Sequence, residues 1–79
     1  MAIIKTRRKD RDKERIVSRE EFIAQLRRLA DALEADKAFV IRVAGERIRV
    51  PRDADLGIEH EREGASEEIE LQLRWKRAR

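Results

Sequence analysis

The 79-residue chain has room for one modest domain, in which 47% of the residues are charged and 41% are hydrophobic. The absence of cysteine excludes disulfides and thiolate metal sites, and one histidine cannot build a zinc site without several carboxylates beside it. The net charge of +3 is unevenly placed, because residues 5–15 include seven basic and three acidic residues. Small domains without disulfides or metal sites often gain stability by association, so a homodimer is one expectation.

The N-terminal segment differs from the rest of the chain. Residues 5–15 carry no apolar side chain, so burial cannot offset the entropy lost on ordering. We predict a disordered basic arm over 1–14, a single domain over 15–77 and a short tail at 78–79. No apolar run approaches the roughly 20 residues of a membrane span, and the positive charge follows the short apolar start, unlike a secretory signal. We therefore expect a cytoplasmic protein with no membrane partner.

The first strong structural signal is the start of a helix at Ser18. The Ser18 hydroxyl should accept a hydrogen bond from the backbone N–H of Glu21, and the Glu21 carboxylate should reach back to the N–H of Ser18. Val17 and Phe22 stand where a hydrophobic staple would lie. Together these positions predict a capped helix start.

Apolar residues then recur at three- and four-residue steps, as they do on one face of a helix. We place this helix at 19–35, with Asp36 as its exit, because Asp tolerates left-handed backbone. Its apolar stripe comprises Phe22, Ile23, Leu26, Leu29, Ala30 and Leu33.

The hydrophobic period changes from 3.6 to 2 behind the helix. Two alternating runs around Gly45 and Glu46 predict a β-hairpin, which Pro51 ends because proline cannot donate to a ladder. Strands are predicted at 56–63 and 67–76. The chain is thus expected to be α+β, with one amphipathic helix packed on one face of a four- or five-stranded, mainly antiparallel sheet.

The predicted core joins the helix stripe to the apolar side of the last strand. Trp75 shares the parity of that side, so it is expected either to pack in the core or to contact a partner. The predicted core anchors are Phe22, Leu26, Leu29, Leu33, Ile69, Leu71, Leu73 and Trp75.

Charged residues follow the outer faces of the predicted strands. They would either form cross-strand ion pairs that keep the sheet soluble or recognise a complementary surface. The candidate interaction surface comprises Arg42, Arg47, Arg49, Glu59, Glu61 and Glu70, beside Glu68. His60 shares the parity of Ile58 and is expected to be a partly buried, hydrogen-bonded structural histidine near the edge of the inner face. A metal or general-base role would need a second positioned group.

The basic arm offers candidate phosphate contacts at Arg7, Arg8, Lys9 and Arg11. Acidic residues interrupt the arm, however, and it has no aromatic side chain on which a base could stack. No nucleophile–base pair and no glycine-rich phosphate loop is visible, so we expect no enzymatic activity and no cofactor.

Four segments, in this order and spacing, are similar to the amphi-Trp domain family, which is named for an amphipathic final strand that closes on a tryptophan. They are SREE (18–21), LRRLADALE (26–34), GERIRVP (45–51) and EIELQLRW (68–75). The helix exit lacks the glycine expected of the family, and the basic arm is longer. The resemblance implies a small prokaryotic domain with no established activity and no known catalytic residues.

The sequence therefore predicts a non-enzymatic protein-interaction or self-associating module with an unknown protein partner. The alternative is a non-specific nucleic-acid-associated protein that binds phosphates through its basic termini.

Overall fold

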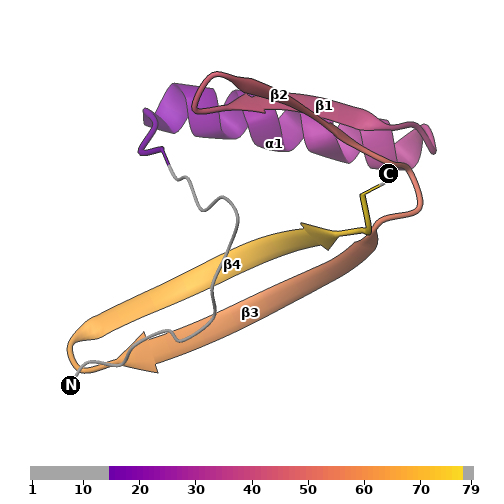
Figure 1. The fold of residues 1–79 in the computed structure, drawn as a ribbon. Coiled ribbons are helices and arrows are strands. Elements are labelled where there is room, and N and C mark those ends of the chain that lie inside the picture. Colours follow the sequence, from indigo (N-terminus) through magenta and orange to yellow (C-terminus); the bar gives the residue numbers. More distant parts are fainter. Residues whose placement is uncertain (1–14, 78–79) are drawn as a thin grey trace.

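The computed structural model describes residues 15–77. In this range one helix and four strands confirm the α+β class. The elements are α1 (Arg19–Glu34), β1 (Phe39–Val43), β2 (Glu46–Val50), β3 (Asp55–Glu63) and β4 (Ser66–Arg74). Figure 1 shows α1 with the β1–β2 hairpin beside it, and the longer β3–β4 hairpin standing apart from them.

The helix begins as predicted, with Ser18 in extended backbone and its hydroxyl accepting from the N–H of Glu21 at 3.1 Å. The return half of the capping box is wrong. The Glu21 carboxylate instead pairs with Arg15, at 2.6 Å and 3.3 Å, because a guanidinium offers two charge-assisted donors where a backbone amide offers one neutral donor.

The helix ends one residue before the predicted limit, and Ala35 is its cap. Asp36 takes the left-handed φ of 58° that was expected of the exit residue. Its N–H donates to the carbonyl of Leu33 at 3.1 Å, and the N–H of Lys37 donates to the carbonyl of Ala32 at 2.9 Å. These two bonds form a Schellman motif, which satisfies carbonyls at the end of the helix.

The predicted first hairpin is confirmed, but its two-residue turn is Ala44 and Gly45, one residue earlier than the predicted Gly45 and Glu46. Val43 therefore lies opposite Glu46. Ala44 and Gly45 both have positive φ, 49° and 86°, as a type I′ turn requires. The second hairpin pairs Glu63 with Ser66 around Gly64 and Ala65. Both turns contain two residues, so each hairpin is tightly closed in register.

The single sheet predicted from the sequence differs from the structure, in which residues 15–77 form two separate two-stranded sheets. The connection between them offers a reason. The Ala54 N–H donates to the Pro51 carbonyl at 3.2 Å, which makes a turn there, and Arg52 binds the Asp36 carboxylate at the end of the helix, 2.7 Å away. Strand β3 thus leaves in a new direction instead of pairing with β2.

The closed core lies between α1 and the first hairpin. Phe39 and its cross-strand partner Val50 are 6% and 5% exposed, and they are the buried hydrophobic residues of the described range. The Arg28 guanidinium lies 5.1 Å from the centre of the Phe39 ring and donates to the Val40 carbonyl at 2.6 Å. This cluster attaches β1 to the helix.

The predicted core anchors do not close into a core within one chain. Leu29 and Leu73 are half-buried, and the other anchors are exposed by a third or more. The exposed anchors are Phe22, Leu26, Leu33, Ile69, Leu71 and Trp75. The physical reason is that β3–β4 stands away from α1, so neither apolar face fully covers the other.

The turn at Ala44 generates a stability prediction. A left-handed alanine costs about 1 kcal/mol, and Asn-Gly is the favoured type I′ pair, so Ala44→Asn should stabilise the domain by about 1 kcal/mol. The midpoint of urea denaturation measures the change. The control is Ala65→Asn, because Ala65 lacks a positive φ. An equal gain in stability in both variants would contradict the assignment of a type I′ turn at Ala44 and Gly45.

Candidate interaction surface

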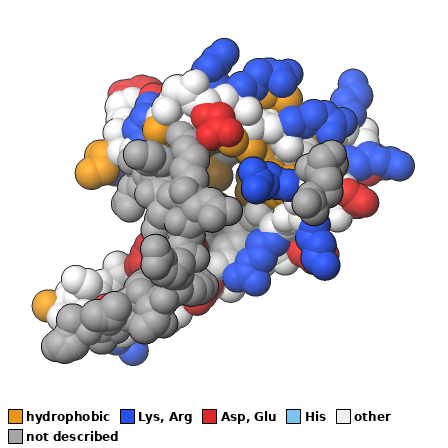
Figure 2. Space-filling model, in the orientation of Figure 1, with side chains coloured by type: hydrophobic (Ala, Val, Ile, Leu, Met, Phe, Trp, Pro, Cys, Tyr) orange, Lys and Arg blue, Asp and Glu red, His pale blue; other side chains and the backbone are white. Residues whose placement is uncertain are grey.

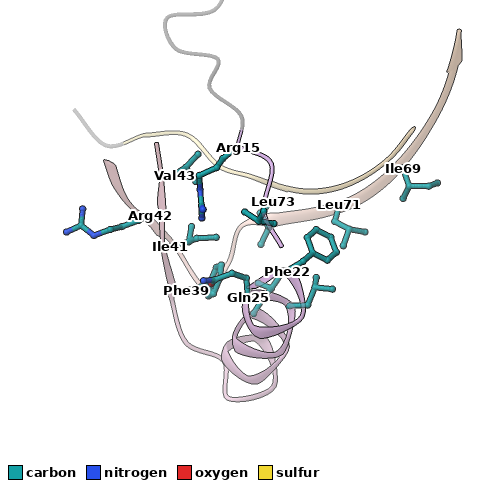
Figure 3. Close-up of a pocket in the computed structure, with 13 residues that line it drawn as sticks. Arg15, Phe22, Gln25, Phe39, Ile41, Arg42, Val43, Ile69, Leu71 and Leu73 are labelled. Carbon is teal, nitrogen blue, oxygen red and sulfur yellow. The ribbon is translucent and has the colours of Figure 1, made fainter. Parts of the chain in front are cut away.

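A wedge-shaped pocket of about 340 Å³ lies between α1, β1 and β4. We call it the wedge. It is lined by Arg15, Val17, Phe22, Gln25, Leu26, Leu29, Phe39, Ile41, Arg42, Val43, Ile69, Leu71 and Leu73. Figure 3 shows Leu71 and Leu73 pointing from β4 toward Phe22, with Ile41 and Val43 at another side. The wedge is therefore apolar on all three elements.

Local structure explains why these side chains converge. Phe22, Leu26 and Leu29 follow at four and three residues along one face of α1. Alternate residues of β1 and of β4 share a face of their strands, which brings Ile41 and Leu71 to the wedge. Six of the eight predicted core anchors line the wedge, whereas Leu33 and Trp75 do not. The anchors were expected to meet in a closed core.

Much of this apolar surface faces open space. Phe22 is 54% exposed and Ile69 is 63% exposed. On β3 the strip continues through Leu56 and Ile58, which lie opposite Leu73 and Leu71 and are exposed as well. A contiguous apolar strip of this kind, on a domain with little closed core, is typical of an interaction surface.

Trp75 follows the last residue of β4 and is 36% exposed. It is not among the residues that line the wedge. The predicted choice between a core residue and a partner contact stays a prediction.

Arg15 stands at the edge of the wedge and is held by Glu21. Their hydrogen bond, with the attraction between the charges, raises the pKa of Arg15. The same hydrogen bond is the main cause that lowers the pKa of Glu21. Both groups therefore stay charged across the neutral range and mark this edge of the wedge as polar.

The outer face of β1–β2 is basic. The register places Arg42 opposite Arg47 and Val40 opposite Arg49, so three arginines share this face. We call it the Arg face. The Arg42 side chain donates to the Gly45 carbonyl at 3.3 Å. Figure 2 shows Lys and Arg side chains gathered over the α1 and β1–β2 layer.

The outer face of β3–β4 is acidic, and we call it the Glu face. Glu59 lies opposite Glu70, and Glu61 lies opposite Glu68. A hydrogen bond shared with Glu59 is the main cause that raises the pKa of Glu70, and desolvation and repulsion by Glu68 and Glu59 add to it. Gln72 donates to Glu59 at 2.7 Å and relieves part of this crowding.

These two faces differ from the cross-strand ion pairing considered for a single sheet. Within residues 15–77, each hairpin has like charges opposite one another, an arrangement that destabilises an isolated hairpin. The sequence order could have revealed this, because a two-residue turn at 44–45 aligns Arg42 with Arg47. The candidate surface residues therefore divide into two separate faces of opposite sign.

His60 lies on the apolar side of β3–β4, opposite Ile69. Its Nε2 is 2.8 Å from the Glu67 carboxylate, which also accepts from Arg62 at 3.0 Å. His60 is exposed, not partly buried as expected, and it belongs to a hydrogen-bonded surface cluster with Glu67 and Arg62 near the second turn. Its structural role stays a prediction.

The remaining candidate sites are limited by what the structure describes. Arg7, Arg8, Lys9 and Arg11 lie outside the described residues. In the part of the chain that is described, no cluster of His, Cys, Asp and Glu could hold a metal ion. The described helix is too short and too polar to span a bilayer.

The Glu59–Glu70 pair generates a pH prediction. A raised pKa means that the folded state holds the proton more tightly than the unfolded state, so stability should rise as pH falls from neutral toward the unfolded pKa. Glu70→Gln should therefore stabilise the domain at neutral pH and flatten its pH dependence.

Thermal melts between about pH 7 and 4.5 measure this effect. Glu63→Gln is the control. It removes the same charge at a residue that lies opposite Ser66 and not opposite another glutamate. Glu21→Gln should instead destabilise the domain at neutral pH, because a lowered pKa gives stability that is present above the unfolded pKa. That stability is lost only as pH falls below the unfolded pKa, so the melts of this variant extend to about pH 3. If the melting temperatures of Glu70→Gln and Glu63→Gln depended on pH in the same way, the interaction between Glu59 and Glu70 would be contradicted.

No curated protein and no solved structure matches the chain. A family model, the Amphi-Trp domain, matches residues 5–79, which confirms the resemblance seen in the sequence. The chain therefore belongs to the Amphi-Trp domain family.

Proposed function

We propose that this domain is a non-enzymatic protein-interaction module that binds a protein partner through the wedge. The carrying observation is the set of apolar side chains that face one another across the wedge and stay exposed, such as Phe22, Ile69 and Leu71. Covering such surface is the main driving force of protein association.

The chemistry of the wedge supports this function. Interfaces combine an apolar centre that contains aromatic residues with a polar rim, and arginine is enriched in them. The residues that line the wedge include the aromatic Phe22 and Phe39 and the basic Arg15 and Arg42. Each guanidinium can bind a carboxylate or a backbone carbonyl of the partner.

We propose no catalytic role, because the polar groups that could take part in catalysis have other partners. The Ser18 hydroxyl caps α1, and His60 pairs with Glu67 on the surface. A general base requires a nucleophile or a substrate proton within hydrogen-bond reach, and neither group is placed beside such a partner.

Leu71→Asn tests the wedge. Leu71 is already 51% exposed, so the substitution should leave the single chain folded, which circular dichroism checks. Burial of a leucine side chain contributes about 1.5–3 kcal/mol, so binding should weaken by about ten- to a hundredfold. The control is Gln72→Asn, on the opposite face of the same strand.

The measurement is sedimentation velocity of the full chain, alone and with proteins that co-purify with it. Complexes that Leu71→Asn dissolves and Gln72→Asn preserves would support the proposal. A chain that stays monomeric and binds no protein would refute it. Binding to duplex DNA that fades steeply above about 50 mM salt and ignores Leu71→Asn would favour the nucleic-acid alternative instead.

A further inference from the structure

We propose that the partner is a second copy of this chain, and that the β3–β4 hairpin of each copy lies alongside β1 of the other. This inference rests on the proposed function, whose wedge it uses. The two copies would be related by a two-fold axis. Their apolar faces would turn inward to one shared core, and their Arg and Glu faces would turn outward.

The first argument is the edge of β1 that faces away from β2. Among the described residues 15–77, strand β1 pairs with β2 on one side, and residues of β1, not of β2, line the wedge. Since Val43 pairs with Glu46 beside the turn, Val40 and Arg42 direct their backbone groups away from β2. Arg28 binds the Val40 carbonyl, so a hairpin would pair toward the Arg42 end. Addition of strands at such an edge is a recurrent mode of recognition.

The second argument is the match of faces and lengths. The side of β1 that carries Ile41 and the side of β4 that carries Leu71 are apolar, so a shared sheet would have one apolar face and one charged face. The hairpin strands have nine residues each, about 30 Å, and α1 has 16 residues, about 24 Å. The strip from Leu56 to Ile69 is thus long enough to reach along the α1 and β1 layer.

The third argument is charge complementarity. The Arg face of β1–β2 and the Glu face of β3–β4 each hold like charges opposite one another. In the shared sheet both faces lie on the same outer side, so the arginines of one copy stand beside the glutamates of the other. In the described part of a single chain, neither two-stranded sheet places the arginine-bearing strands beside the glutamate-bearing strands.

The same chain's hairpin does not fill this place in the structure. It stands across the wedge from β1, as Figure 3 shows for Leu71 and Leu73. The turn at 51–54 and the Arg52–Asp36 pair, 2.7 Å apart, direct it there. A second copy can therefore reach the edge of β1 without any change in this connection.

Two charge-reversed chains test the proposal. One carries Arg42→Glu and Arg47→Glu, and the other carries Glu59→Arg and Glu70→Arg. Each keeps like charges within its hairpin, as in the native chain, so its own folding is matched. Alone, each should dimerise about tenfold or more weakly than the native chain, since every mixed sheet then brings like charges together.

Mixing the two variants in equal amounts should restore a dimer near native strength, because both mixed sheets of the heterodimer are complementary. Native mass spectrometry detects this heterodimer by its mass. Failure of the mixture to rescue association would overturn the proposal, since closure within one chain cannot be rescued by mixing.

A native chain that is strictly monomeric would also overturn it. If that monomer bound another protein in a Leu71-dependent manner, the proposed function would stand without the homodimer. If it bound no protein, both would fall.

Discussion

The packing of Phe39, the first residue of β1, against α1 is the contact on which the rest of the structure depends. Phe39 and Val50 are buried together, and Arg28 covers the ring while it binds the edge of β1. This cluster sets the position of β1 and hence one wall of the wedge. It is small, because a domain of this size buries a limited share of its surface. The remaining apolar strips stay exposed in one chain.

The second constraint is the short connection after Pro51. It separates two hairpins that have the right composition to share a sheet, with apolar faces of similar period and outer faces of opposite sign. Exposed strand edges and exposed apolar strips are normally covered in soluble proteins. Their coincidence at the wedge supports the proposal that a binding partner completes the sheet and the core.

The limits of the helix were predictable to within one residue. Ser18 caps the helix and Asp36 follows its end, because each depends on groups within four residues along the chain. The first turn was expected at Gly45 and Glu46 and lies one residue earlier, at Ala44 and Gly45. The Glu21 carboxylate was predicted to bind the N–H of Ser18. It binds the charged guanidinium of Arg15 instead, six residues away along the chain. The candidate surface was predicted as a set of residues but not as two faces.

The sequence by itself determined the element types and the family, since hydrophobic period and capping chemistry act over a few neighbouring residues. Only the tertiary structure decided the register of each hairpin, the division of the four described strands into two sheets, and the open wedge that six of the eight predicted anchors line. The direction in which a chain leaves a short connection depends on contacts between distant residues, here Arg52 and Asp36. No periodic pattern records such a contact, which is why the closed core was predicted where the structure has an open one.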